Sequence, residues 1–355
     1  MKKIFFLGLS VSLLLGGCSS LKQSPSSDST EASNQHSDGA VELAGNLDVP
    51  WSIQKHEDVF YISERPGNIV RIAGSELERQ TVHLSEDLSG GSEAGLLGFI
   101  LDPNFEENNE AFAYYTYLKA KGAFNRIVKL RLENNEWAEV EILLDQLPAG
   151  NYHDGGRLAI GPDNKLYVTV GDAYNLNEVQ ELDSLNGKIL RLNLDGTIPE
   201  DNPYENSYIF SYGHRNPQGL VWTPDGTMYA SEHGNNANDE INIIEAGKNY
   251  GWPLIEGTEE QEGMEVPLFT SGSDETWAPS GMDEWNNHLY VAALRGSAIL
   301  EFDLENQTVH SFIEDYGRIR DVLIVGDDLF FITNNLDGRG NGSSDDDKLY
   351  RIELN

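Results

Sequence analysis

Short apolar segments with alternating polar positions recur along the chain, and each recurrence has the same plan. An alternating apolar segment is followed by a polar loop and then by a second apolar segment. A period of two residues is typical of β-strands that bury one face, because successive side chains of a strand point to opposite sides. The pattern occurs at residues 59–72, 111–132, 165–194, 227–244, 288–304 and 329–354.

Six such units of roughly 50 residues predict an all-β fold, a six-bladed β-propeller. A single unit would expose its strand edges and one apolar face, whereas radial packing of the units buries those faces. We therefore expect one domain over residues 40–355, closed into a ring by a strand from residues 41–47 that joins the last blade. A functional site is expected in the loops at an end of the central channel.

The first 39 residues differ from the repeats in composition. Lys2 and Lys3 precede an apolar run at 4–15, which is too short to cross a membrane, and the run ends in LGGC at 15–18. The small residues before Cys18 resemble the lipobox of bacterial lipoproteins, in which the cysteine becomes a lipidated N-terminus. We predict a lipoprotein signal peptide over 1–18 and an extracytoplasmic protein held at the membrane by lipid. An ordinary signal peptide is the alternative.

Residues 19–39 are rich in Ser, Gln, Asn and Asp, which predicts a flexible polar tether. The whole chain has 59 acidic and 24 basic side chains and a formal net charge of -35. Such a charge argues against nucleic acid or an anionic membrane surface as a partner. Cys18 is the only cysteine, so the chain cannot form an internal disulfide.

The sequence HDGGR at 153–157 directly precedes a predicted hairpin, LAIGPDNKLYVTVGD, which ends at Asp172. With the turn at 161–164, His153 and Asp172 are equidistant from its centre and are expected to face each other across neighbouring strands. A carboxylate beside an imidazole fixes the ring tautomer and makes the second nitrogen a better base. A purely structural His–Asp pair is the alternative.

Two further segments gather polar side chains between apolar strands. The segment at 209–220 contains His214, Arg215, Asn216 and Gln218, and Arg318 and Arg320 lie two residues apart on a predicted strand, so that they share a face. Three arginines at one channel mouth would repel one another unless an anion is bound there. Arginines in surface ion pairs are the alternative.

The segment at 231–253, SEHGNNANDEINIIEAGKNYGWP, combines turn-forming Gly and Asn residues with Asp239 and Glu240. Backbone carbonyls and carboxylates are oxygen ligands that suit Ca²⁺ better than zinc. A loop rich in Asn and Asp that binds no ion is the alternative.

Taken together, these segments resemble the PQQ-dependent soluble glucose dehydrogenase and aldose sugar dehydrogenase family, six-bladed propellers that oxidise sugars at the anomeric carbon. The resemblance covers nearly the whole predicted domain, with nine motifs in the family's order. They are SERPGNIVRI, EAGLLGFILDPNF, HDGGRLAIGPDNKLYVTVGD, GKILRLNLDGTIPEDNP, GHRNPQGL, SEHGNNANDEIN, NYGWP, APSGM and GRIRDV.

The resemblance implies an enzyme in which His153 takes the proton from the anomeric hydroxyl of an aldose while hydride passes to the quinone, with Asp172 supporting the histidine. It also implies a set of contacts to PQQ, the cofactor that accepts the electrons. The residues assigned to these contacts are Arg215, Asn216, Arg318, Arg320 and Glu93.

Calcium is the second cofactor that the resemblance implies. The carbonyls of Gly234 and Asn235 would hold the ion that polarises PQQ, and Glu240 with the Tyr250 carbonyl would form part of a second, structural site. The electron acceptor is a membrane quinone or a redox protein that the sequence does not identify.

One departure from the family pattern concerns a lysine that contacts PQQ in the soluble glucose-oxidising branch. The corresponding segment here, APSGMDEWNNHLYV at 278–291, has no lysine. The loops are also shorter, which places the chain nearer the aldose sugar dehydrogenase branch. Two other classes remain open: a calcium-dependent lactonase or esterase on the same fold, and a propeller lipoprotein that binds glycans or proteins without catalysis.

Overall fold

The structure is a computed structural model, and it describes residues 39–354. These residues belong to one compact unit, Gly39–Asn355. The predicted signal peptide, Cys18 and residues 19–38 of the predicted tether lie outside the described residues. Within residues 39–354, no helix is long and apolar enough to cross a membrane.

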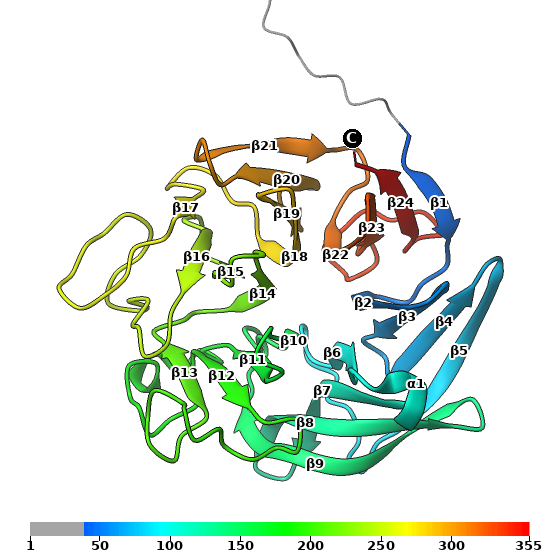
Figure 1. Ribbon diagram of the computed structural model, residues 1–355, viewed down its shortest axis with the longest axis horizontal. Coiled ribbons are helices and arrows are strands. Elements are labelled where there is room, and N and C mark those ends of the chain that lie inside the picture. The colour runs from blue at the N-terminus through cyan, green and yellow to red at the C-terminus, as the bar shows by residue number, and fades with distance from the viewer. Residues whose placement is uncertain (1–38, 355) are drawn as a thin grey trace, which may run out of the picture. The chain divides into compact units, whose positions relative to one another are not determined.

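The strands form four-stranded antiparallel sets arranged around a centre (Figure 1). The first set is β2 (Pro50–His56), β3 (Val59–Glu64), β4 (Asn68–Ala73) and β5 (Glu76–His83). The second is β6 (Leu96–Leu101), β7 (Glu110–Lys119), β8 (Gly122–Glu133) and β9 (Glu136–Pro148). The third is β10 (Leu158–Ile160), β11 (Leu166–Val170), β12 (Lys188–Leu192) and β13 (Ile209–Tyr212).

The fourth set is β14 (Pro217–Trp222), β15 (Met228–Glu232), β16 (Glu240–Ile244) and β17 (Phe269–Thr270). The fifth is β18 (Pro279–Trp285), β19 (His288–Ala293), β20 (Ala298–Asp303) and β21 (Thr308–Ile313). The last is β22 (Ile319–Val325), β23 (Asp328–Thr333), β24 (Leu349–Glu353) and β1 (Val41–Ala44). The helices described are one turn each, α1 (Phe105–Asn108) and a 3₁₀ helix at Leu176–Glu178.

The first strand of each set lies innermost, and these strands contact one another in the ring order β2, β6, β10, β14, β18, β22 and back to β2 (Figure 1). The prediction of an all-β propeller is confirmed. The number of blades stays a prediction, because a parallel pair between β5 and β9 joins the first two sets into one eight-stranded sheet.

The ring is closed by β1, which pairs with β24 of the last set as the sequence predicted. Its register places Val41 opposite Arg351 and Ala44 opposite Leu349. Leu47, just after β1, is buried against residues of the first and last sets. The two ends of the propeller are therefore held together by backbone pairing and by a shared apolar core.

Each predicted repeat corresponds to the second and third strands of a set, for example β3 with β4 and β19 with β20. The innermost strands lie outside the repeated pattern, and two of them were expected from other signals: β10 from the hairpin after HDGGR, and β22 from the spacing of Arg318 and Arg320. The outermost strands were not predicted because they are exposed and polar, as in β21.

Apolar clusters lie between neighbouring sets and fix their spacing. One cluster packs Phe112 and Ile127 of the second set against Val168 and Leu190 of the third, and all four side chains are fully buried. Burial of such side chains typically stabilises a fold by about 1.5–3 kcal/mol each. The polar loops at the end of the channel are thus carried on a rigid ring of packed sheets.

Candidate active site

His153 lies in the loop between β9 and β10, and Asp172 lies two residues after the end of β11. The hairpin pairs Leu158 with Val168, and the amide of Ala173 donates to the carbonyl of His153. The register is therefore one residue away from the predicted one, and the prediction that His153 and Asp172 sit opposite each other in the hairpin is wrong. The difference arises because the turn spans Gly161 to Lys165.

The two side chains nevertheless meet, with 2.7 Å between His153 Nδ1 and Asp172 Oδ1. The loop leaves the strand direction at His153, whose φ is +62°, and continues through Gly155 and Gly156 at positive φ. At Gly155 a Cβ would lie 2.6 Å from the carbonyl oxygen of Thr169, so only glycine fits there. The glycines of the HDGGR motif thus bring the imidazole to the carboxylate.

Asp172 is fully buried and accepts three hydrogen bonds. Its Oδ1 accepts from His153 and from the amide of Tyr174 at 2.9 Å, and its Oδ2 accepts from Trp252 Nε1 at 2.8 Å. A carboxylate so placed can only accept, so the proton of the imidazole is on Nδ1. Nε2 of His153 therefore carries a free lone pair, and among the described residues it has no hydrogen-bond partner.

Trp252 and Tyr174 are site residues that the sequence analysis missed. Trp252 lies 80 positions from Asp172, and its motif, NYGWP, signalled only that the segment belonged to the family pattern. The ring of Tyr174 stacks on the imidazole of His153, with 4.2 Å between the ring centroids and 23° between the planes. The imidazole is thus fixed by a hydrogen bond at one nitrogen and by ring stacking on one face.

Glu93, in the loop between β5 and β6, holds the backbone of the histidine loop. Its Oε2 accepts from the His153 amide at 2.9 Å, and its Oε1 accepts from Arg339 Nη1 at 2.9 Å. Burial alone would raise the pKa of Glu93, but the amide of His153 and the charge of Arg339 outweigh it and hold the pKa below its ordinary value. Both carboxylate oxygens are therefore occupied by protein donors.

Arg215 and Arg320 are buried, and within residues 39–354 neither has a carboxylate at ion-pair distance. Arg215 donates through Nη1 to the carbonyl of His233 at 3.1 Å, and Arg320 donates through Nη1 to Gln218 Oε1 at 2.8 Å. Burial, with the nearby Arg65 and Arg318, lowers the pKa of Arg320 to about 9. Two buried cations without counter-charges predict an anionic ligand.

Arg318 differs from Arg320 although the two are neighbours in sequence. Its Nη2 lies 2.7 Å from Asp337 Oδ2, and its Nη1 donates to the carbonyl of Leu294 at 3.2 Å. Arg318 precedes β22, and the register shifts between Ile319 and Asp321, so the two guanidinium groups have different partners. Arg318 is already neutralised within the protein, as the ion-pair alternative expected, whereas Arg320 is not.

Four buried nitrogen atoms near this site have no hydrogen-bond partner. They are Arg215 Nε, Asn216 Nδ2, His233 Nε2 and Arg320 Nε. Burial, together with the charges of Arg215 and Arg320, lowers the pKa of His233 to about 3, so its ring is neutral. An unpaired buried donor costs about 1–3 kcal/mol, so a ligand that supplies oxygen acceptors would relieve several such costs at once.

An inner cavity of about 240 Å³ is lined by two of these four residues, Arg215 and His233. Its lining includes Glu93, His153, Tyr174, Arg215 and His233. His153 and Arg215 therefore line the same cavity. This cavity can hold an anionic, oxygen-rich molecule next to a proton acceptor.

Gly234 and Asn235, assigned to calcium, also line the inner cavity. The amide of Gly234 donates to Asp239 Oδ1 at 2.9 Å, and that of Asn235 donates to Glu256 Oε1 at 2.8 Å. No described residue donates a hydrogen bond to either carbonyl oxygen. These carbonyls are thus free to bind a cation, although residues 39–354 contain no group of three or more His, Cys, Asp or Glu side chains that could hold a metal.

Glu240 and Tyr250, assigned to the second calcium site, lie near Glu232. Glu240 pairs with Glu232 across β15 and β16. Burial and the charge of Glu232 raise the pKa of Glu240 to about 8. Glu232 accepts from His214 Nδ1 at 2.8 Å, and the ring of His214 stacks on that of Tyr250 at 4.8 Å. Two facing carboxylates repel each other unless one is protonated or a cation lies between them.

Known proteins of one family are similar to this chain in sequence. The family description Glucose / Sorbosone dehydrogenase matches residues 47–350. Aldose sugar dehydrogenase YliI of Escherichia coli is 29% identical over 82% of this chain and 88% of its own length. Quinoprotein glucose dehydrogenase B of Acinetobacter calcoaceticus is 34% identical over 69% of this chain, which spans only 58% of that protein.

The fold of residues 39–354 agrees with a solved structure of the same family. The PQQ-bound form of aldose sugar dehydrogenase from Streptomyces coelicolor superposes with a TM-score of 0.83 and is 32% identical. The superposition covers 88% of this chain and 96% of the Streptomyces chain. By sequence and by fold, the chain belongs to the glucose/sorbosone dehydrogenase family.

Proposed function

We propose that the protein catalyses the PQQ-dependent oxidation of aldose sugars at the anomeric carbon to lactones. The observation that carries this proposal is the free lone pair of His153 Nε2 beside buried, unpaired arginine nitrogens. The sugar-oxidising, quinone-containing relatives support it.

PQQ fits the nitrogen donors of the site, because its carboxylates and quinone carbonyls are the acceptors that these donors lack. Arg215, Asn216 and Arg320 would hold the cofactor through these atoms. Glu93 and Arg318, also assigned to PQQ, are occupied by protein partners and would act by positioning the loops around it. The chemistry that PQQ would supply when bound is that of a quinone able to accept a hydride from C1 of the sugar.

His153 performs the proton transfer of the reaction. Its Nε2 takes the proton of the C1 hydroxyl as the C1–H bond breaks, so the C1–O bond becomes the carbonyl of the lactone. Asp172 stabilises the imidazolium that forms, because it already accepts the Nδ1 proton. The indole of Trp252 and the amide of Tyr174 keep the carboxylate from rotating.

Calcium binding is part of the same proposal. The free carbonyls of Gly234 and Asn235 in the inner cavity would hold one ion, and Glu240 with the Tyr250 carbonyl would hold another next to Glu232. A cation there would offset the repulsion between the two facing glutamates. We also propose that Cys18 is lipidated and anchors the protein outside the cytoplasm, and that a membrane quinone or a redox protein takes up the electrons.

Reconstitution tests the function directly. Purified protein is mixed with PQQ and Ca²⁺, and reduction of an artificial dye is followed with and without aldose. Sugar-dependent reduction that requires PQQ is expected. A calcium-dependent lactonase would instead hydrolyse lactones without PQQ, and a binding protein would do neither. The nitrogen-rich wall of the inner cavity favours the quinone enzyme over the lactonase, which needs a set of carboxylates around a central metal.

A further inference from the structure

Trp51, on the innermost strand β2, is a buried tryptophan with two arginines over its ring. The guanidinium carbon of Arg157 lies 4.5 Å from the ring centroid, and that of Arg320 lies 5.9 Å from it. Both distances are within the range of about 6 Å over which the face of an aromatic ring attracts a cation. All three side chains are buried, so water screens these contacts little.

Arg157 has a counter-charge in addition to the ring. Its Nη1 lies 3.1 Å from Asp321 Oδ2, and its Nε donates to the carbonyl of Gln218 at 2.7 Å. Asp321 also accepts from the amide of Ile53 at 2.9 Å, which fixes the carboxylate between two innermost strands. The charge of Arg157 is therefore balanced within the protein.

Arg320 lacks such a balance. Its Nη1 donates to Gln218 Oε1 at 2.8 Å and to Ser280 Oγ at 3.3 Å, and both partners are neutral. Its Nε has no partner, and no carboxylate of the described chain lies at ion-pair distance from it. Burial of a cation without a counter-charge is unfavourable. The electron-rich face of Trp51 offsets part of this unfavourable term.

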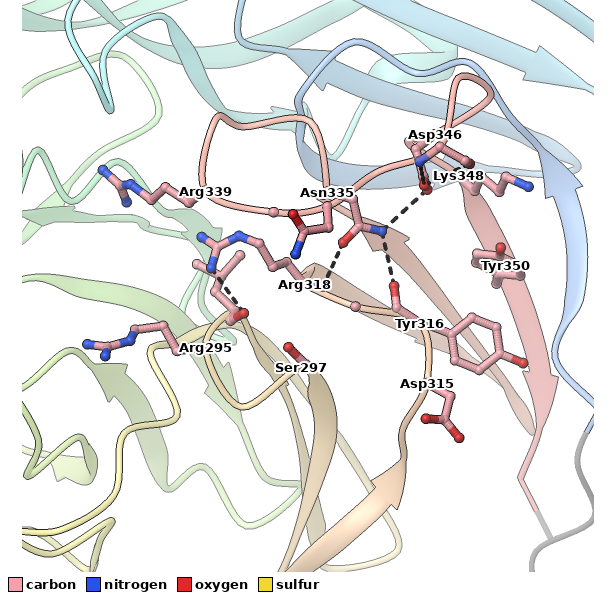
Figure 2. Close-up of a pocket in the computed structure, with 15 residues that line it drawn as sticks. Arg295, Ser297, Asp315, Tyr316, Arg318, Asn335, Arg339, Asp346, Lys348 and Tyr350 are labelled. Carbon is pink, nitrogen blue, oxygen red and sulfur yellow. Dashed lines mark hydrogen bonds between the residues drawn. The ribbon is translucent and has the colours of Figure 1, made fainter.

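Arg318, two residues before Arg320, is stabilised in a different way. Its Nη2 lies 2.7 Å from Asp337 Oδ2. Its Nη1 donates to the carbonyl of Leu294 at 3.2 Å, and its amide donates to Asn335 Oδ1 at 2.8 Å (Figure 2). A carboxylate partner of this kind competes with an anionic ligand for the same N–H donors. A neutral aromatic face stabilises the cation without neutralising its charge.

We propose that Trp51 is a positioning residue of the cofactor site, whose indole face holds Arg320 as an unbalanced cation for an anionic group of PQQ. The inference rests on the proposed function, in which Arg320 holds the cofactor. Trp51 does not line the inner cavity, so it acts through Arg320 and not by contact with PQQ or sugar. It is therefore expected to set the affinity for PQQ more than the rate of the chemical step.

Titration of the apoprotein with PQQ tests the proposal. Trp51→Leu keeps an apolar side chain but removes the aromatic face. It is expected to weaken PQQ binding about 5- to 30-fold, the effect of a desolvated cation–π contact, with turnover largely recovered at saturating PQQ. Trp51→Phe is expected to lose less affinity, because a smaller aromatic face remains.

A fluorinated tryptophan at position 51 separates the charge effect from packing. Fluorine on the benzo ring withdraws electrons from its face and changes the shape of the side chain little. The PQQ affinity of this protein is expected to lie between those of wild type and Trp51→Leu, with a Tm near that of wild type. This protein also decides the question if Trp51→Leu does not fold.

Trp137→Leu is the matched control, because it makes the same substitution at another buried tryptophan. Trp137 lies on β9, and its ring packs against the rings of Tyr61, Phe99 and Phe105. Loss of these contacts is expected to lower Tm. The affinity for PQQ is expected to stay at the wild-type value, since no cofactor residue depends on this ring.

A double-mutant cycle shows whether Trp51 acts through Arg320. In an Arg320→Met background, Trp51→Leu is expected to change PQQ affinity less than about twofold. Urea unfolding of the same four apoproteins measures the contact without the cofactor. The cycle is expected to give a coupling of about 5- to 30-fold in the unfolding equilibrium constant, in favour of the wild-type pair.

Three results would overturn the proposal: wild-type PQQ affinity in Trp51→Leu, an equal loss in the Arg320→Met background, or a fluorinated protein that binds PQQ like wild type. A wild-type protein that binds no PQQ would contradict the proposed function instead. The unfolding cycle would then still decide whether the indole stabilises Arg320, so the two failures can be told apart.

Discussion

At the scale of single residues, the geometry of Asp172 determines what His153 can do. The carboxylate has three donors, and they come from the hairpin loop and from Trp252, which is distant in sequence. The His153–Asp172 pair could be predicted from a motif within twenty residues. The indole donor could not, because its approach depends on how the third and fourth sets of strands are placed around the channel.

Removal of the indole donor is predicted to slow catalysis through Asp172. In Trp252→Phe one buried carboxylate oxygen loses its partner, which typically costs about 1–3 kcal/mol, so kcat is expected to fall about 5- to 150-fold. The measurement is a double-mutant cycle with Asp172→Asn. The effect of Trp252→Phe is expected to be much smaller in the Asp172→Asn background, because the indole acts through that carboxylate. Additive losses would show that Trp252 acts by another route.

The two neighbouring arginines are predicted to differ in cofactor affinity. Arg320→Ala removes a buried cation without a counter-charge and is expected to weaken PQQ binding roughly 10- to 150-fold, with turnover largely recovered at saturating cofactor. Lysine at 320 is expected to restore only part of the affinity. Arg318→Ala is expected to affect PQQ less and to lower the thermal stability, because it leaves Asp337 buried and unpaired.

Titration of both apoproteins with PQQ, together with thermal melts, checks this difference. Equal loss of affinity in the two variants would mean that Arg318 exchanges Asp337 for the cofactor. Wild-type affinity for PQQ in Arg320→Ala would remove the main support for assigning this buried arginine to the cofactor.

At the scale of secondary-structure elements, the repeated apolar pattern located only the middle strands of each set, whereas β1, β10 and β22 were expected from other features of the sequence. The middle strands are long and alternate strictly, whereas β10 has three residues and β21 is largely exposed. The register of β10 against β11 was also predicted incorrectly, because the turn after β10 is one residue longer than its Gly-Pro-Asp-Asn sequence indicated. A one-residue difference in a turn changes every pairing in a hairpin, so local sequence signals alone do not fix it.

The closing strand is predicted to matter for stability. Replacement of residues 41–44 by Gly-Ser-Gly-Ser would weaken the pairing of β1 with β24 and expose a strand edge. A loss of about 2 kcal/mol would lower Tm by about 3 °C in a domain of this size. The same replacement at the exposed residues 258–261 is the control and is expected to leave Tm unchanged. Identical Tm values for both variants, without aggregation, would show that β1 does not hold the ring closed.

At the scale of the whole molecule, the acidic composition and several buried carboxyl groups set the response to pH. Burial raises the pKa of Asp154 to about 6, and burial likewise raises that of Asp283 to about 7. Between the ordinary pKa of an aspartate in an unfolded chain, about 4, and these raised pKa values, the folded protein binds more protons than the unfolded chain. The contributions of these two carboxyl groups to the free energy of unfolding are therefore expected to fall as pH rises from about 4 to 7 and to level off above that range.

Asp154→Asn is predicted to reduce this pH dependence. Its Oδ1 accepts from the Gly150 amide and from Asn125, which an asparagine can also do, while its buried Oδ2 has no partner. The variant is expected to be more stable than wild type at pH 8 by up to about 3 kcal/mol and to differ little at pH 4. Urea unfolding at both pH values measures the difference. A variant that is less stable at pH 8 would contradict this account of Asp154.

The central claim is that His153 Nε2 is the base of a quinone-dependent sugar oxidation. The measurement that tests it most directly is the rate at which glucose reduces the bound cofactor in a single turnover, followed by absorbance in wild type and His153→Ala reconstituted with PQQ and Ca²⁺. The account predicts equal PQQ affinity and a rate about 10²- to 10⁴-fold lower in the variant, the usual effect of removing a general base. Reduction of the cofactor at the wild-type rate in His153→Ala would contradict it.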